Sequence, residues 1–370
     1  MSKVFFGPAQ ARHQKWQSTL PGKLDLILHK LDFASQLDKK RVCIKMHLGG
    51  NVGYTTVHPV FVRRVVSFVK AAGGRPFVTD NFHSALSAHE RGYTQEVIGC
   101  PILPAAGAGD KYLHVHPVNY KTLSELHIAG EIWDADYLIC LSHAKGHGNS
   151  AYGGAIKNLA LGAMIGRTRH DLHMVQHAES YWDPQRCTHY SDECNLCIEA
   201  CPVNAMRFAD DRTLHVGFHE CVFCCDCNEV CPTGGLSIRE VIAEDFQEVM
   251  ALATQAVLSS FPEGGAAYIN LATNITPFCD CWGFTTPNLV PDIGIFASRD
   301  MVAVEQATLD SIDHRHLIPG SVPPWLVLRD VEGHLFKKIH GKDPYVQVRA
   351  CERLGLGSSE YEIEEVEAEG

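Results

Sequence analysis

The stretch from Ser191 to Pro232 holds the residues whose spacing is most specific to one kind of chemistry. Its second half contains four cysteines separated by two, two and three residues and followed by a proline: Cys221, Cys224, Cys227, Cys231 and Pro232. Thiolates at this spacing wrap a tight loop around an iron–sulfur cubane, and the fourth cysteine reaches across to another cluster in two-cluster proteins. The spacing therefore predicts iron–sulfur binding.

The first half of the stretch repeats this pattern, with Cys194, Cys197 and Cys201 followed by Pro202. Under the crossed arrangement of two-cluster ferredoxins, Cys201 joins the later loop. The expected ligands of the second [4Fe-4S] cluster are then Cys201, Cys221, Cys224 and Cys227. Structural zinc is the alternative, but zinc sites usually pair two short Cys loops instead of running four cysteines into a Cys-Pro.

One position breaks the repeat, because Ser191 stands where the first motif should begin. Cys187 lies four residues upstream, close enough for a short bulge to deliver it as the missing ligand. We therefore favour a first cluster held by Cys187, Cys194, Cys197 and Cys231. The other interpretation is that one corner of the first cluster has no cysteine ligand. The site would then hold a [3Fe-4S] cluster, or an iron bound by serine or water. Cys225 is a spare thiol that we expect to pack and not to ligate.

Alternating strand and helix patterns flank this cysteine-rich stretch. Residues 41–46 (RVCIKM) predict a buried strand, residues 60–71 a helix and residues 76–79 a second strand, after a first strand at 3–6 and a helix at 24–37. A strand–helix–strand order implies a right-handed crossover and parallel strands. Ligands of such sheets bind outside the carboxyl ends of the strands, here at residues 47–58 and 80–83.

The same alternation continues along the rest of the chain. We expect a loop at 99–110, a buried strand at 136–141, a loop at 142–149, a helix at 240–259, strands at 266–271 and 293–297, and a helix at 300–312. The predicted fold is α/β, with a mostly parallel sheet built from both chain halves and an inserted two-cluster ferredoxin-like unit of the α+β class. The expected divisions are 1–182, 183–238 and 239–370, the last ending in a solvated acidic tail from Glu360 to Glu369.

Glycine-rich, mildly basic loops follow several of the predicted strands. Glycine lets backbone N–H groups turn inward around an anion, and Lys or His adds positive charge. The alternative is that the glycines only make tight turns and the polar residues cap helices. The candidate cofactor-binding residues are Lys45, His47, Gly49, Gly50, Asn51, Thr55, Thr56, Asn81, His143, Lys145, Gly146, His147, Lys157, Asn158, Cys279 and Cys281.

Several stretches together resemble a known family. They are KMHLGGNVGYTTVHP, SHAKGHGNSAYGGAIKNLALG, the two Cys-Pro motifs, ITPFCDCWGFTTPNLVPDIGIFASRDMVAVEQATLD and GLGSSEYEIEEV. The chain resembles, over nearly its whole length, the cluster-bearing members of the domain-of-unknown-function 362 family. This resemblance implies a fold and a cofactor class more than a reaction. The chain departs from the family at Ser191, where other members begin the first motif with a regular cysteine.

A physical argument then suggests what the loops bind. Iron–sulfur clusters pass single electrons, whereas a flavin accepts one or two and can couple the two kinds of step. We therefore expect FMN, or a modified form such as prenylated FMN, in an iron–sulfur flavoprotein. The regular glycine fingerprint of dinucleotide sites is absent from the sequence, which argues against NAD bound through such a fingerprint.

Two other functions stay open at this point. The chain could be a ferredoxin-like carrier whose α/β domain only docks a partner. It could also be a non-redox metalloenzyme with structural clusters, using His47, His143, His147, His170 or His173.

Composition narrows the possible partners and compartment. The 370-residue chain has a net charge of −11, which argues against nucleic acid because phosphate binding needs a basic face. No signal peptide or membrane-length apolar run is visible. Fifteen cysteines then indicate metal binding in a reducing cytoplasm, with an anaerobic host favoured by oxygen-sensitive clusters. We expect a redox partner protein, and an oligomer is possible.

Overall fold

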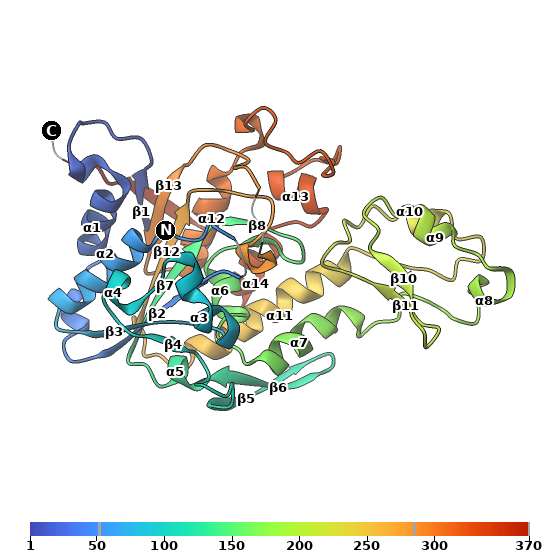
Figure 1. The fold of residues 1–370 in the computed structure, drawn as a ribbon, viewed down its shortest axis with the longest axis horizontal. Coiled ribbons are helices and arrows are strands. Elements are labelled where there is room, and N and C mark those ends of the chain that lie inside the picture. The colour runs from blue at the N-terminus through green and yellow to red at the C-terminus, as the bar shows by residue number, and fades with distance from the viewer. Residues whose placement is uncertain (51–52, 284–285, 369–370) are drawn as a thin grey trace.

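The computed structural model, shown in Figure 1, describes residues 1–50, 53–283 and 286–368. Its largest element is an eight-stranded sheet with the strand order β14-β1-β13-β12-β7-β2-β3-β4. The pairs from β4 through β3, β2 and β7 to β12 are parallel, and β1 pairs in parallel with β14. Among the described strands of this sheet, only β13 runs the other way. The predicted fold class, α/β with a mostly parallel sheet from both chain halves, is confirmed.

The sheet strands are β1 (Ser2–Pro8), β2 (Arg41–Met46), β3 (Arg75–Asp80), β4 (Ile102–Pro104), β7 (Tyr137–His143), β12 (Ala266–Ala272), β13 (Gly294–Ser298) and β14 (Tyr361–Glu365). Three hairpins are formed by β5 (Leu113–Tyr120) with β6 (Leu123–Ala129), β8 (Lys145–His147) with β9 (Ala151–Gly153), and β10 (Met206–Phe208) with β11 (Leu214–Val216).

The α-helices in the first part of the chain are α1 (Leu20–Lys30), α2 (Pro59–Ala71), α3 (Phe82–Leu86), α4 (Gln95–Ile98), α5 (Gly130–Trp133), α6 (Ala155–Ala160) and α7 (Gly166–Met174). Those that follow are α8 (His189–Asp192), α9 (Leu196–Glu199), α10 (Asp226–Glu229), α11 (Val241–Leu258), α12 (Met301–Ser311), α13 (Leu335–His340) and α14 (Val346–Arg353).

Helices cover both faces of the sheet, as Figure 1 shows for α1 and α2 on one side and α6 and α11 on the other. Because successive side chains of a strand point to opposite faces, β2 contributes to two cores. Val42, Ile44 and Met46 join the core under α1 and α2, whereas Cys43 joins the core under α6, α11 and α12. This three-layer arrangement leaves the strand ends open for a site.

The cysteine-rich insert forms a lobe that projects from the α/β body, with α8 at its far end in Figure 1. It has a small core of its own around Met206, Phe218 and Leu236. The chain enters and leaves the lobe at adjacent points, because Trp182 and Leu236 pair as an antiparallel bridge. The two segments that connect the lobe to the body therefore run side by side.

Most predicted elements have the expected type, but several boundaries were wrong. The helix expected at 24–37 begins at Leu20 and ends at Lys30. The loop expected at 99–110 contains β4, and the loop at 142–149 contains β8 and part of its hairpin with β9. These strands are three residues long, too short to show a hydrophobic period.

The acidic C-terminal segment is also not the solvated tail that its composition suggested. Residues 361–365 form β14, an edge strand whose Glu364 is 2.9 Å from the ammonium of Lys3 and 2.6 Å from that of Lys30. Basic residues of β1 and α1 thus neutralise part of this charge.

In the part of the chain that the structure describes, none of the helices has the length and apolar character needed to cross a bilayer.

Candidate functional site

Five cysteines of the lobe line one small cavity, and four of them are Cys201, Cys221, Cys224 and Cys227. These are the residues that the crossed arrangement predicts for the second cluster. Cys201 comes from the first motif and is brought to the later loop by the contact of α9 with α10. Cys225 also lines this cavity, but its sulfur lies within 3.7 Å of the Phe223 carbonyl and 3.6 Å of the Ile238 carbonyl, as a packed thiol would.

The first motif brings Cys187 close to Cys194 and Cys197. Burial raises the pKa of the Cys197 thiol, and repulsion from the Cys187 and Cys194 thiolates raises that pKa further. On the other side, the Cys231 sulfur lies 3.7 Å from the Thr233 hydroxyl, and a Cβ at Gly235 would lie 3.3 Å from the Cys187 backbone nitrogen.

Ser191, the other candidate for this corner, is exposed and bonded elsewhere. Its hydroxyl donates to the Thr188 carbonyl at 3.3 Å and to the Asp192 carboxylate at 3.1 Å. The local geometry thus favours Cys187 over Ser191 as a ligand.

A larger cavity of about 310 Å³ lies in the α/β body where β2, β3 and β7 end. Polar residues follow the last apolar positions of these strands, so the sheet itself brings them together. The predicted residues that line it are Lys45, His47, Asn81, His143, Lys145, His147, Lys157, Asn158, Cys279 and Cys281.

A buried hydrogen-bond network fixes one wall of this cavity. The Lys45 ammonium lies 3.0 Å from the Asp80 carboxylate and 2.7 Å from the Asn158 amide oxygen. Burial alone would raise the pKa of Asp80, but the Lys45 charge and hydrogen bonds from His47 and the Leu48 N–H hold that pKa well below its usual range. The Asp80 carboxylate is therefore ionised, and the Lys45 bonds join β2 and β3 to α6.

A second buried network surrounds Asp280. Its carboxylate contacts the Lys145 ammonium and lies 3.2 Å from Nδ1 of His143 and 3.1 Å from the Thr55 hydroxyl. Burial, and then the Lys145 charge, lowers the pKa of His143 to about 3, so this imidazole is neutral at pH 7. Asp280 thereby anchors the loop that carries the flanking cysteines.

The sulfurs of Cys279 and Cys281 face the cavity beside an ammonium. Nζ of Lys157 lies 3.1 Å from the Cys279 sulfur and 3.8 Å from the Cys281 sulfur. A hydrogen bond from the Cys281 thiol and the Lys157 charge hold the pKa of Cys279 well below its usual range, against the effect of burial. Hydrogen bonding to Cys279 raises the pKa of Cys281 instead. The pair thus shares one proton at neutral pH.

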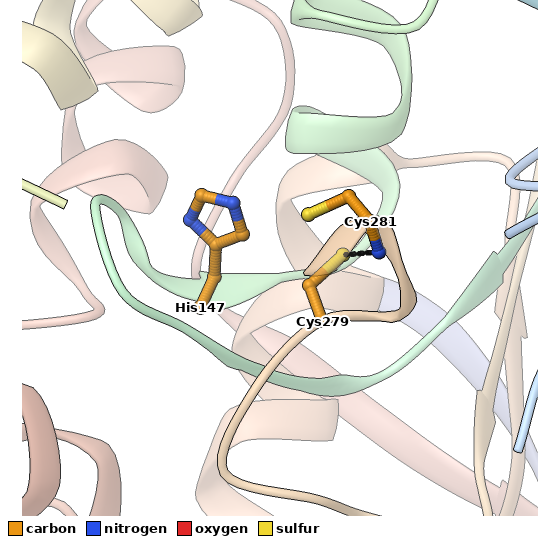
Figure 2. Close-up of side chains that lie close together, drawn as sticks. All are labelled: His147, Cys279 and Cys281. Atoms are coloured by element: carbon orange, nitrogen blue, oxygen red, sulfur yellow. Dashed lines mark hydrogen bonds between the residues drawn. The ribbon is translucent and has the colours of Figure 1, made fainter. Parts of the chain in front are cut away.

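His147 completes this group, and Figure 2 shows its ring beside the two sulfurs. One ring nitrogen and both sulfurs lie within 4.8 Å of one another, a spacing that could hold a metal ion. Nδ1 of His147, however, accepts hydrogen bonds from the backbone N–H groups of Asn149 and Ser150, at 3.2 Å each. Because burial keeps the pKa of His147 low, the neutral ring carries its proton on Nε2.

Some predicted residues support the cavity from outside. Thr55 and Thr56 are buried, and Gly49, Gly50, Thr55, Thr56 and Gly146 are not among the residues that line it. Gly49 has φ +80°, and a Cβ there would lie 2.5 Å from the Thr56 methyl group. At Gly146, a Cβ would lie 2.1 Å from the Pro277 carbonyl oxygen, so the β8–β9 hairpin packs closely on the loop before Cys279. Asn51 lies outside the described residues.

The sequence prediction missed several lining residues, above all His219 and Arg169. His219 comes from the lobe, two residues before Cys221, and its ring lies 4.7 Å from that of His147. The HEC sequence was a signal, because it places an imidazole beside a cluster ligand. Nothing in the sequence showed that this ring meets a loop more than sixty residues away.

A comparison with family models finds a match to "Domain of unknown function (DUF362)" over residues 42–310. The chain belongs to the DUF362 family. This confirms the family resemblance, and the match covers the strands that form the cavity as well as the whole lobe.

Comparison with characterised proteins finds relatives named ferredoxin. One, from Methanothermococcus thermolithotrophicus, is 33% identical over 48 residues, which are 13% of this chain and 80% of the relative. Another, from Streptomyces griseus, is 27% identical over 99 residues, or 27% of this chain and 91% of the relative. The DUF362 chain thus contains a segment related to iron–sulfur ferredoxins.

Among solved structures, the lactate racemase apoprotein from Thermoanaerobacterium thermosaccharolyticum matches with a TM-score of 0.30 and 11% identity. The match covers 60% of this chain and 50% of the racemase. At that level of similarity it bears on neither fold nor function.

Proposed function

We propose that this DUF362 protein is an iron–sulfur redox protein in which two [4Fe-4S] clusters of the lobe exchange electrons with a small molecule in the α/β cavity. The similarity to ferredoxins supports the cluster class. The ligands we propose are Cys187, Cys194, Cys197 and Cys231 for the first cluster, and Cys201, Cys221, Cys224 and Cys227 for the second.

The observation that carries this proposal is the position of His219. Its ring lines the α/β cavity and lies close to His147, while two residues later the chain supplies Cys221 to the cysteine-lined cavity of the lobe. Lys342 reinforces the junction, since its ammonium bonds to the carbonyls of Gly148 and Phe218. A cluster beside Cys221 would therefore be one short segment away from a molecule in the cavity.

The outer part of the lobe suits a redox partner protein. Tyr190 lies between Cys187 and Cys194, and Leu196 lies between Cys194 and Cys197, and each is 45% exposed. Val230, next to Cys231, is 39% exposed. Apolar side chains exposed beside cluster ligands are suited to a transient protein contact. We propose that electrons enter or leave through the first cluster at this end.

For the cavity we propose a flavin, FMN or prenylated FMN, as the organic cofactor. Lys157, Arg169 and His170 line the cavity and suit a phosphate group. The fit to the ring is weaker, because among the described lining residues there is no Phe, Tyr or Trp on which it could stack. A bound flavin would supply coupling between one- and two-electron steps.

Anaerobic purification tests this proposal, with iron, sulfide and any released small molecule measured on the same sample. We expect about eight irons per chain from two cubane clusters, and a flavin mass in the released fraction. Iron near eight without any organic molecule would contradict the flavin but not the clusters. Iron near zero would overturn the whole proposal. About seven irons would indicate a three-iron first cluster and count against Cys187.

A carrier whose α/β domain only docks a partner is the competing function. The cavity argues against it, because docking a partner protein does not require a cavity in the body lined by polar side chains such as Lys45, Asp80 and Lys157. Electron transfer from reduced clusters to an external acceptor that is unchanged when Lys157 is replaced by Met would favour the carrier.

A further inference from the structure

The pair Cys279 and Cys281 is chemically unusual in a chain whose other thiols outside the lobe are buried in the cores. Cys281 is exposed, Cys279 is buried behind it, and a 3-10 turn, η5 (Asp280–Trp282), brings both sulfurs to the same cavity. We propose that Cys279 and Cys281 are a redox-active dithiol that closes to an intramolecular disulfide and is reduced again by the clusters of the lobe. This inference rests on the two clusters of the proposed function, and it makes the small molecule of the cavity a substrate in place of the flavin.

The contacts of the pair are those of an activated thiolate. The Cys279 sulfur accepts hydrogen bonds from the Lys157 ammonium at 3.1 Å and from the backbone N–H of Cys281 at 3.5 Å. A ring nitrogen of His147 lies within 4.8 Å of both sulfurs, and the ring carries its proton on Nε2 because Nδ1 accepts hydrogen bonds from the backbone. Thiolates stabilised by cations and N–H donors are the reactive form of cysteine.

The same contacts disfavour a metal ion. A cation bound by both sulfurs would lie beside them, where the Lys157 ammonium already stands at 3.1 and 3.8 Å. Coordination by His147 would need a lone pair on Nε2, but two backbone N–H groups point at Nδ1 and keep the proton on Nε2. A dithiol is compatible with the Lys157 ammonium beside the sulfurs and with the proton on Nε2 of His147. A metal centre would require the ammonium to move and the proton to leave Nε2.

The pair also lies on a plausible electron path from the second cluster. From Cys221 the chain leads in two residues to His219, whose ring lies 4.7 Å from that of His147 and 4.5 Å from that of Trp282. Trp282 adjoins Cys281 in sequence, and the His147 ring faces both sulfurs. Contacts between aromatic rings therefore lead from His219 of the lobe to residues next to the pair.

The redox step balances without an added cofactor. The disulfide accepts two electrons, one from each reduced cluster, and two protons from water; the S–S bond breaks and two thiols form. The dithiol then reduces a substrate disulfide by exchange: a mixed S–S bond forms, the substrate releases two thiols, and the protein disulfide returns. Lys157, Arg169 and His170 line the cavity and favour an anionic substrate, so the class we infer is a small anionic disulfide.

The test uses the full, cluster-loaded chain under anaerobic conditions, with oxidised glutathione as the probe. After treatment with the probe and its removal, dithionite is added stepwise while cluster absorbance is followed. We expect the wild type to take up about two more electrons per chain than the double variant Cys279→Ser with Cys281→Ser, because a single variant would keep a mixed disulfide with the probe that also accepts two electrons. Alkylation and mass spectrometry should find the Cys279–Cys281 disulfide before dithionite and both thiols after it. Cys100→Ser, in the buried core under α2, should match the wild type.

Equal electron uptake by the wild type and the double variant, with clusters that contain about eight irons and are reduced normally, would overturn the dithiol and leave the proposed function standing. A stoichiometric metal besides cluster iron that is lost in Cys279→Ser would also overturn it, in favour of a metal centre. If both proteins lack iron, the proposed function itself fails.

Discussion

Lys157 shows how one residue can set the chemistry of its neighbours. It extends from α6 to the two sulfurs, and the charge of the Cys279 thiolate raises the pKa of Lys157 even though burial acts to lower it. The ammonium in turn favours the thiolate. Each group therefore keeps the other charged at neutral pH.

Replacing Lys157 by Met should raise the pKa of Cys279 and slow its alkylation. Because only the thiolate reacts, wild-type Cys279 should stay reactive as pH falls from 8 to 6, and the variant should lose about tenfold in rate for each unit of pH below its new pKa. Labelling with iodoacetamide at several pH values, read by mass spectrometry, measures this. Lys15→Met, at an exposed position, is the control; identical profiles for Lys157→Met and the wild type would contradict the role of the ammonium.

At the first cluster, the choice between Cys187 and Ser191 can be decided by iron content. Cys187→Ser should lower iron by about one to four per chain, because a cubane that loses a ligand becomes a three-iron cluster or is lost. Ser191→Ala should leave iron unchanged, since its hydroxyl bonds to Thr188 and Asp192. Iron and sulfide analysis of anaerobically reconstituted protein measures both. The opposite result, loss only in Ser191→Ala, would assign the corner to serine.

Among the elements, α6 has the greatest influence on the cavity, because it carries both Lys157 and Asn158. Its N-terminus has no side-chain cap at Gly154 and is held by Glu305 of α12, whose carboxylate accepts from the N–H groups of Ala155 at 2.7 Å and Ile156 at 3.3 Å. The same carboxylate accepts from the Asn270 amide at 2.7 Å. A short helix is thus positioned by a buried acid from a distant part of the chain.

Glu305→Ala should lower the free energy of unfolding by about 3 kcal/mol, because several buried donors lose their acceptor. Urea denaturation followed by far-UV circular dichroism gives the value. Gln306→Ala, one residue along α12 and bonded at the surface to Asp310, should change stability by less than about 0.5 kcal/mol. Similar effects of the two substitutions would show that the α6 terminus does not depend on Glu305.

The elements also show which features the sequence could predict. Residues 41–46 form β2 with the expected bounds, because a run of apolar residues between a basic segment and a Gly-rich loop is a clear strand pattern. The β8–β9 hairpin could not be predicted, since its strands have three residues each and depend on Gly146 packing against Pro277.

For the site, strand-end residues such as Lys45 and Lys145 could be placed together by the rule for parallel sheets. His219 could not, because its position depends on how the lobe docks on the body. Thr55 and Thr56 were expected to contact the ligand, but both side chains make contacts inside the fold. The Thr55 hydroxyl bonds to Asp280, and the Thr56 methyl group packs against Gly49. Sequence spacing alone cannot distinguish a threonine that binds a ligand from one that makes contacts inside the fold.

For the whole molecule, the junction of lobe and body depends on a buried ammonium. Lys342 is 2% exposed and donates to the Gly148 carbonyl in the body and, at 2.7 Å, to the Phe218 carbonyl in the lobe. Arg329 adds a hydrogen bond of 2.6 Å to the Val222 carbonyl. These bonds hold the lobe loop next to the cavity.

Lys342→Met should loosen this junction without unfolding either part. We expect amide hydrogen exchange in residues 217–223 to become about tenfold faster, which corresponds to roughly 1.4 kcal/mol of local stability. Exchange in β2 and β7 should not change. Lys338→Met, whose ammonium bonds to the Val331 carbonyl, is the matched control; equal exchange at 217–223 in both variants would show that Lys342 does not hold the lobe.

The adjacent entry and exit of the lobe at Trp182 and Leu236 make it an exchangeable module. A protein engineer could replace the segment between them with a cluster unit of different reduction potential, joined at the same two points. The driving force for electron transfer would then change while every residue that the body contributes to the cavity stayed in place. His219 sets the condition for such a graft, because the new unit would have to present an imidazole at the same position.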